Sequence, residues 1–306
     1  MTVLTLTNFY NRIKKAVFCI FNIKVVKSMN ELQLKQTANE IRKGIVASVH
    51  SAKAGHPGGS LSCADILTYL YFVEMNVDPT NPKDENRDRF VLSKGHAAPA
   101  LYATLAERGF FPKEDLTTLR KIGSYLQGHP DMKHIPGVDM STGSLGQGIS
   151  CAVGMAMAAR IQNKDYRTYA ILGDGEIQEG QVWEAAMFAG ARKLDNLAIV
   201  IDNNGLQIDG NISDVCSPYP FDEKFKAFGF HVINIDGLDF AQIAAAFEEA
   251  KTVKGMPTAI VAKTVKGKGV SFMENKAGWH GKATNPEEFA IAMEDLEKVG
   301  AALCQK

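Results

Sequence analysis

A strand–helix–strand pattern between positions 167 and 210 constrains the fold of this chain more than any other part of its sequence. Residues 169–172 form a short apolar run of strand length, which ends at Gly173-Asp174-Gly175, where small residues let the backbone turn sharply. Apolar residues recur at helical spacing over 178–194, and 197–201 is a second apolar run typical of a buried strand. Such a crossover makes the two strands parallel, so the sequence predicts an α/β fold with a mostly parallel sheet and helices on both faces.

Polar side chains follow both predicted strands. Asp174 and Asn204 should lie at the same edge of the sheet, because parallel strands end on one side. One carboxylate, one amide oxygen and a loop carbonyl near Leu206 form a hard oxygen site that suits Mg²⁺ or Ca²⁺ and leaves positions for phosphate oxygens. Gly173 and Gly175 would let the backbone approach a diphosphate closely. Either turn alone is more simply an Asp-Gly or Asn-Gly turn, but the pair with strands between them favours a metal diphosphate site.

Four of the seven histidines lie in turns rich in glycine or flanked by Gly and Pro: His56, His96, His129 and His280. Loops at strand ends are where sites form, although any one of these histidines alone is more simply a surface or capping residue. Residues 263–269, KTVKGKG, form a basic, glycine-rich segment. It could cover phosphates or be a solvated loop, and both interpretations stay open.

Composition and charge exclude several classes of protein. The chain has 34 Lys and Arg against 34 Asp and Glu, so its net charge gives no reason to expect nucleic acid or a membrane surface as a partner. Its 45% hydrophobic and 22% charged residues are ordinary for a globular protein. The five cysteines are widely separated and form no Cys-x-x-Cys pair, which argues against a disulfide framework or a zinc site and favours a reducing cytoplasm.

Residues 1–28 differ from the rest, because they contain basic residues, no acid and an apolar patch over 16–23. The patch is too short to span a bilayer, and no convincing cleavage site of a signal peptide follows it. We expect a poorly packed, dispensable leader upstream of a native start at Met29, followed by one α/β domain over 29–306. That domain should begin with a helix, whose apolar residues run from Leu32 to Val49, and close with a helix near 287–303.

The motifs together resemble a known family. Gly173-Asp174-Gly175 followed by Asn203-Asn204 is similar to the cofactor signature of thiamine diphosphate enzymes. Five further segments resemble blocks of transketolases in the same order: residues 55–60 (GHPGGS), 92–97 (LSKGHA), 128–130 (GHP), 141–148 (STGSLGQG) and 278–281 (GWHG). The resemblance runs from about residue 30 to about residue 286. It implies a thiamine diphosphate-binding fold.

The resemblance also implies roles for the residues that match its motifs. Asp174 and Asn204 would bind the metal through their side chains, and Leu206 through its carbonyl oxygen. The residues expected to contact thiamine diphosphate are His96, Gly143, Leu145, Gly173, Gly175, Asn204 and His280. Departures from the family occur at Ser144, where many transketolases have proline, and at the variable positions Asn203 and Gly205.

In the catalytic role, the resemblance implies that His56 and His129 bind the donor sugar and that His280 joins them in orienting hydroxyls and moving protons. Glu179 matches an acid near the subunit interface, although a first-turn helix glutamate explains it equally well.

Transketolases are about twice as long as this chain, which ends where their pyrimidine-binding domain would begin. The resemblance therefore implies the diphosphate-binding subunit of a split transketolase. It would move a two-carbon unit from a ketose phosphate to an aldose phosphate only with a pyrimidine-binding C-terminal transketolase subunit, in a heterotetramer. Another thiamine enzyme subunit, of the 2-oxo acid dehydrogenase or deoxyxylulose phosphate synthase type, should lack the His56 and His96 blocks. A dinucleotide-binding dehydrogenase needs a third glycine that is missing after Gly175. A non-catalytic binding protein is the remaining alternative.

Overall fold

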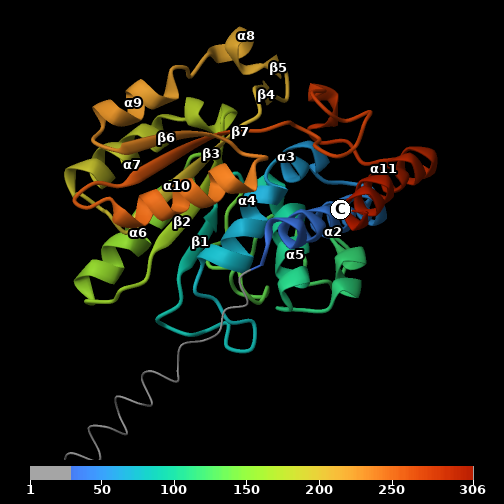
Figure 1. Ribbon diagram of the computed structural model, residues 1–306, viewed down its shortest axis with the longest axis horizontal. Helices are drawn as coiled ribbons and strands as arrows, with labels where there is room; N and C mark the ends of the chain where they lie inside the picture. Colours follow the sequence, from blue (N-terminus) through green and yellow to red (C-terminus); the bar gives the residue numbers. More distant parts are fainter. Residues whose placement is uncertain (1–28, 306) are drawn as a thin grey trace, which may run out of the picture.

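The computed structural model describes residues 29–305, and the predicted leader, residues 1–28, lies outside the described residues (Figure 1). Its main feature is a five-stranded sheet in which all neighbouring strands are parallel. The strands, in their order across the sheet, are β1 (Arg89–Leu92), β2 (Thr168–Gly173), β3 (Leu197–Asn203), β7 (Thr258–Lys263) and β6 (His231–Asp236). The predicted parallel sheet is confirmed.

The central strands are apolar throughout because helices cover both faces of the sheet. Along β2, Tyr169 and Ile171 point into one hydrophobic core, while Ala170 and Leu172 point into the other. The helices that pack on the second core are α6 (Gln147–Ile161), α7 (Gly180–Ala191) and α9 (Phe221–Ala227). Those of the first core are α2 (Glu31–Ala52), α4 (Ala64–Tyr69), α5 (Ala98–Arg108), α10 (Phe240–Thr252) and α11 (Pro286–Cys304). Figure 1 shows the two layers on either side of the strands.

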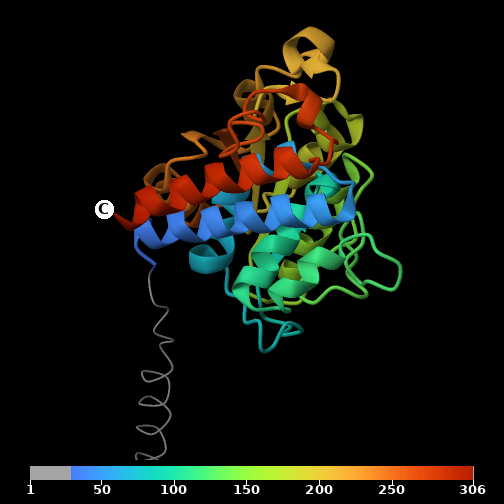
Figure 2. The same ribbon diagram turned by 90° about the vertical axis from the view of Figure 1, so that its right-hand side faces the viewer.

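The predicted first and last helices are confirmed as α2 and α11, which lie side by side and run in opposite directions (Figure 2). Asn30 and Asn285 each cap their helix with a reciprocal capping box, which satisfies the backbone nitrogens of the cap and of the third helical residue. Between the helices, Asn39 Nδ2 donates to the carbonyl oxygen of Leu296 at 2.8 Å. The helices at the two ends of the described chain therefore pack against each other in the layer that covers the first core.

The helix predicted over 178–194 begins later than expected. A short 3₁₀ helix, η4 (Gly175–Gln178), comes first, and Glu179 is extended (φ −70°, ψ 128°) before α7 starts at Gly180. Because Asp174 caps η4 by accepting from the backbone of Gly175, the turn after β2 takes up residues that the apolar periodicity assigned to the helix.

The parallel arrangement places the carboxyl ends of the strands at one edge of the sheet. Loops leave β1, β2, β3 and β7 at this edge, which also carries the short α3 (Pro57–Ser62) and the hairpin of β4 (Leu206–Gln207) with β5 (Gly210–Asn211); α8 (Ile212–Cys216) follows the hairpin. Within residues 29–305, no helix is both long and apolar enough to cross a membrane.

Candidate active site

A cavity of about 270 Å³ opens at the carboxyl edge of the sheet. The predicted site residues that line it are His96, Leu145, Gly173, Asp174, Gly175, Asn204, Leu206 and His280. They come from the loops after β1, β2 and β3, from the segment before α6 and from the segment after β7. The structure thus brings together most of the residues that the sequence proposed for the cofactor and the metal.

The three predicted metal ligands lie together. Gly173 pairs with Asp202 across β2 and β3, so Asp174 faces the loop that carries Asn204 and Leu206. The Asp174 carboxylate accepts from the backbone nitrogen of Gly175 at 2.8 Å and from that of Gly205 at 2.5 Å. Burial, with a contribution from Asp202, raises the pKa of Asp174 to about 6 despite these donors.

Asp202, which the sequence analysis did not single out, orients Asn204. Its buried carboxylate pairs with the ammonium of Lys94 and accepts from Asn204 Nδ2 at 3.2 Å. Because the amide nitrogen is held by Asp202, the amide oxygen of Asn204 is directed elsewhere and accepts from the backbone nitrogen of Leu206 at 3.2 Å. Burial alone would raise the pKa of Asp202, but Lys94 holds it below its ordinary value.

Three of the four predicted histidines form a cluster. The ring centroids of His56, His96 and His280 lie 5.0 to 5.4 Å apart. Burial and neighbouring cations lower the pKa of each ring, that of His280 to about 4, with Lys266 the main cation beside it. The imidazoles are therefore neutral near pH 7 and able to donate or accept hydrogen bonds.

His129 lies apart from this cavity, in contact with Gly143. A β-carbon at Gly143 would stand 3.0 Å from Cδ2 of the His129 ring, and the φ of Gly143 is +152°, so both space and backbone favour glycine there. Tyr102 fixes the segment by donating from its hydroxyl to the carbonyl oxygen of His129 at 2.8 Å. Burial lowers the pKa of His129, and the Arg120 charge lowers it further.

Lys266, within the basic segment 263–269, faces the site, so this segment is not wholly solvated. Its side chain is buried, and its Nζ donates to the carbonyl oxygen of Leu206 at 3.2 Å and lies 3.0 Å from Nδ1 of His280. Burial and the charge of Lys94 lower the pKa of Lys266 to about 8. It has no carboxylate ion-pair partner within residues 29–305. The sequence predicts a basic loop but carries no sign of which lysine turns inward.

The donors present fit a divalent cation that carries a diphosphate. Asp174, Asn204 and Leu206 offer a carboxylate, an amide and a carbonyl oxygen, which are ligands that Mg²⁺ and Ca²⁺ accept. Across the part of the chain that the structure describes, no three acidic, histidine or cysteine residues are grouped to hold a metal, so a cation here would need further oxygens from its ligand. The Lys266 ammonium and the histidine cluster suit an anionic ligand.

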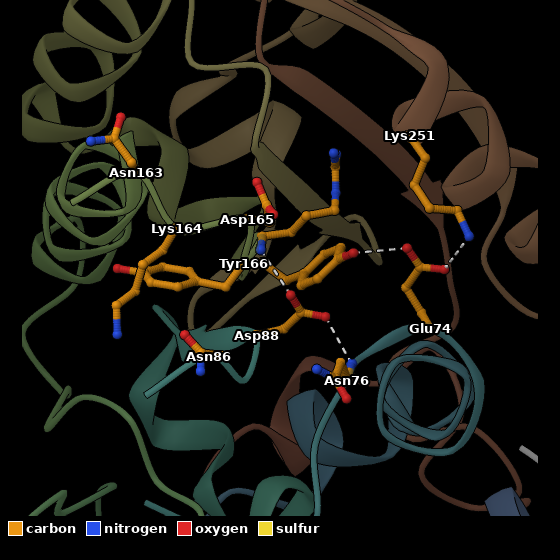
Figure 3. Close-up of a pocket in the computed structure, with 11 residues that line it drawn as sticks. Glu74, Asn76, Asn86, Asp88, Asn163, Lys164, Asp165, Tyr166 and Lys251 are labelled. Carbon is orange, nitrogen blue, oxygen red and sulfur yellow. Dashed lines mark hydrogen bonds and ion pairs between the residues drawn. The ribbon is translucent and has the colours of Figure 1, made fainter. Parts of the chain in front are cut away.

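A second cavity, of about 430 Å³, lies at the opposite edge of the sheet (Figure 3). Several of its charged groups engage one another or the backbone. Glu74 accepts from the hydroxyl of Tyr169 at 2.8 Å and pairs with Lys251 at 3.2 Å, while Asp88 accepts from the backbone nitrogens of Asn76 and Arg167 at 2.8 Å. These contacts join η1 (Leu70–Glu74), α10 and the start of β2, and no predicted site residue lines the cavity.

Comparison with known proteins decides the family. The family description "Transketolase, thiamine diphosphate binding domain" matches residues 33–298. The chain belongs to the transketolase family. It is 47% identical over 274 residues to the 6-deoxy-6-sulfo-D-fructose transketolase subunit SqwG of Clostridium sp. (strain MSTE9), covering 90% of this chain and 100% of that protein. It is 44% identical to one of the subunits of the apulose-4-phosphate transketolase of Phocaeicola vulgatus, covering 87% and 94%.

Solved structures agree with this transketolase assignment. The transketolase of Campylobacter jejuni superposes with a TM-score of 0.82 at 35% identity, over 90% of this chain and 46% of that one. The chain thus spans about half the length of the solved transketolases it matches. The predicted family, fold and class, a transferase subunit, are confirmed, and the dehydrogenase and non-catalytic alternatives are set aside. The roles of individual site residues stay predictions.

Proposed function

We propose that this chain binds thiamine diphosphate and Mg²⁺ and, with a pyrimidine-binding partner subunit, transfers a two-carbon ketol unit from a ketose phosphate to an aldose phosphate. The observation that carries the proposal is the meeting, at one sheet edge, of Asp174 with the Asn204–Leu206 loop beside buried cationic and imidazole groups. If the thiamine diphosphate site is shared with a partner subunit, this chain holds only part of it. We therefore expect little activity from the chain alone.

In this proposal Asp174, Asn204 and Leu206 hold the cation. Lys266 and His280 face the diphosphate, with Gly173 and Gly175 leaving room for close backbone approach. His96 lies in the same cluster as His280 and completes the anionic pocket. Gly143 and Leu145 lie on the segment that would run beside the thiazolium and aminopyrimidine rings. We prefer Mg²⁺ to Ca²⁺, because few protein ligands plus phosphate oxygens are its usual coordination.

The bound cofactor would supply the nucleophilic carbon that accepts the two-carbon unit. The chain would supply orientation and proton transfer. His56 and His280 are neutral imidazoles in contact with each other, so one can donate to a sugar hydroxyl while the other accepts. His129, on the Gly143 side, would bind the sugar from a second direction.

The substrate is proposed to be a sugar with an anionic terminus. The two similar proteins named above differ in their stated sugars, one a sulfosugar and the other apulose 4-phosphate. The anionic terminus of the substrate could therefore be a phosphate or a sulfonate, since the names of the relatives include both. The partner subunit is expected to bind this group. We also propose a cytoplasmic enzyme, consistent with the free thiols of Cys63, Cys151, Cys216 and Cys304.

A heterotetramer of two such chains and two partners is proposed from the surface of α6 and α7. Both helices lie in the outer layer, yet they carry exposed apolar side chains: Ile161 is 73% exposed, Met187 59% and Phe188 42%. Apolar residues of this size on the outside of two contacting helices favour a covered face. A second copy of the chain is the proposed occupant.

The test is a two-carbon transfer assay with thiamine diphosphate and Mg²⁺, on the chain alone and mixed with its candidate partner. We expect transfer only in the mixture, with xylulose 5-phosphate and with 6-deoxy-6-sulfofructose compared as donors. Asp174→Ala should reduce cofactor-dependent transfer at least 100-fold, since it removes the charged metal ligand. Asp165→Ala, at the opposite edge of the sheet, is the matched control and should leave transfer unchanged. Transfer by the chain alone would refute the two-subunit site.

A further inference from the structure

Glu176 is a buried carboxylate beside the proposed cofactor that takes no part in the proposed chemistry. It lies on η4 and is 2% exposed. Its Oε1 accepts from the hydroxyl of Ser93 at 2.5 Å and from the backbone nitrogen of Gly146 at 2.9 Å, and its Oε2 accepts from the backbone nitrogen of Gly173 at 3.0 Å. All three neighbours donate, so both carboxylate oxygens act as acceptors.

The three donors belong to three segments that are distant in sequence. Ser93 follows β1 and directly precedes Lys94, which pairs with Asp202. Gly146 follows Leu145 and is the N-cap residue of α6. No side chain caps this N-terminus. Gly173 ends β2, immediately before Asp174. One carboxylate therefore joins the loops that follow β1 and β2 to the segment before α6.

Close packing and backbone conformation restrict the movement of these segments. The φ of Gly146 is +79°, a backbone conformation that its backbone bond to Glu176 helps to hold. A β-carbon on Gly148 would stand 2.6 Å from the Cα of Ser93, so the start of α6 packs directly on the end of β1. A shift of one segment would be passed to the other.

We propose that Glu176 is a positioning residue for the cofactor. Its carboxylate sets the Asp174 turn, the Leu145 segment and the Ser93 loop in the mutual arrangement that a metal diphosphate and its thiamine rings need. This inference rests on the proposed function for the identity of the ligand. The contacts themselves stand without it, which allows the two to be tested separately.

Glutamine at this position makes a defined conflict. In Glu176 one carboxylate oxygen accepts from the Gly146 nitrogen and the other from the Gly173 nitrogen. An amide has only one acceptor oxygen, and its nitrogen is a donor, so glutamine cannot make both bonds. Whichever way the amide turns, one buried backbone N–H faces another donor. Ser93→Ala is milder, because it keeps both backbone bonds and removes only the hydroxyl.

The experiment titrates thiamine diphosphate with Mg²⁺ into the full chain, measured by calorimetry, and repeats the titration with the partner through transfer activity. Glu176→Gln should raise the half-saturating cofactor concentration about 10- to 100-fold, the usual effect of removing a residue that orients metal ligands. The turnover at saturating cofactor should fall less than that. Ser93→Ala should raise the half-saturating concentration less than Glu176→Gln does. Glu297→Gln, at an exposed glutamate on α11, should change neither quantity.

Amide hydrogen exchange supplies a readout without cofactor or activity. Glu176→Gln should lose protection in peptides covering 141–150 and 168–178 while α2 and α11 keep theirs. Unchanged cofactor affinity and unchanged exchange in Glu176→Gln would overturn the inference, even if transfer works. Absent transfer in the wild-type mixture, with the exchange effect present, would instead refute the proposed function and leave the positioning role. If Glu176→Gln does not fold, Ser93→Ala decides, and wild-type affinity in that variant would overturn the inference.

Discussion

At the scale of single residues, the two buried lysines of the cofactor edge differ in their partners. Lys94 is neutralised by Asp202. Burial alone would lower the pKa of Lys94, but the Asp202 carboxylate outweighs this effect and raises it. Lys266 is equally enclosed, but the polar contacts of its Nζ are with a carbonyl oxygen and an imidazole. Asp174 and Asp202 act on Lys266 only from a distance. Burying an ammonium without a directly paired carboxylate costs free energy, so this position favours ligand binding at the expense of the empty chain.

Lys266→Met should therefore separate stability from binding. We expect the melting temperature without cofactor to rise by a few degrees, because the substitution removes a buried charge and keeps the apolar stem. The half-saturating concentration of thiamine diphosphate should rise about 10- to 100-fold. Thermal unfolding and calorimetric titration measure the two effects. Lys268→Met, at a partly exposed lysine that pairs with Glu274, is the control and should change neither by much. A lower melting temperature with normal affinity would contradict the prediction.

His280 should make the fold less stable in acid. Burial, Lys266 and His56 lower its pKa to about 4, whereas the unfolded chain takes up this proton near pH 6.5. Between these values the unfolded state binds more protons, so stability falls as the pH drops from about 6.5 toward 4. The melting temperature of His280→Asn should fall less over this range than that of the wild type. His134→Asn, at an exposed histidine, should follow the wild type. Parallel curves for His280→Asn and wild type would refute this contribution.

At the scale of elements, the antiparallel pair α2 and α11 closes one layer with local signals at each start. Both helices have an asparagine cap with a reciprocal partner at the third helical residue, and α11 adds a proline at its first position. These signals act within a few residues, as does the apolar periodicity from which the first helix was predicted. The pairing of the two helices depends on contacts such as Asn39 with Leu296, far apart along the chain.

Asn285→Ala should weaken α11 without disturbing the site. Loss of the cap should cost about 1 kcal/mol, equivalent to a melting temperature lower by roughly 2 to 4 °C for a chain of this size. Cofactor affinity should be unchanged, because α11 carries none of the residues of the cavity. Lys298→Ala, which breaks only an exposed pair with Glu294, should cost less than about 0.5 kcal/mol. Equal losses in the two variants would show that the cap contributes nothing specific.

At the scale of the whole molecule, the parallel sheet separates two edges and two faces. The carboxyl edge gathers the proposed site, while the opposite edge holds a cavity whose charged groups are largely paired or bonded to the backbone (Figure 3). One face is closed by α2 and α11, whereas the outer surface of α6 and α7 keeps large apolar side chains exposed. In the proposed assembly, the molecule therefore presents the carboxyl edge of the sheet to the cofactor and the partner subunit, and the α6 and α7 surface to a second copy of the chain.

Met187→Glu should disrupt self-association through the α6 and α7 surface. A charge placed in a buried apolar interface costs more than the contact it replaces, so the apparent mass in sedimentation velocity should fall by half. Val299→Glu introduces the same charge at an exposed apolar position on α11, where Val299 is 43% exposed, and should leave the mass unchanged. A wild-type chain that sediments as a monomer with its partner present would refute the proposed heterotetramer.

The sequence by itself determined the two central strands β2 and β3, the terminal helices and the family, because each depends on residues that are close together or on fixed motifs. The apolar runs at 169–172 and 197–201 became β2 and β3, and the turns after them placed Asp174 and Asn204 at one edge as expected. Both positions could be predicted because a parallel crossover leaves few geometric choices.

Only the tertiary structure decided which side chains complete the site. Lys266 faces inward while nearby Lys268 pairs near the surface with Glu274, and His129 lies beside Gly143 and does not line the cavity. Glu176 had no sequence signal at all, since two of its three donors, Ser93 and Gly146, lie on distant segments. Burial and contacts between distant segments arise from how the layers pack, and no local spacing of residues encodes them.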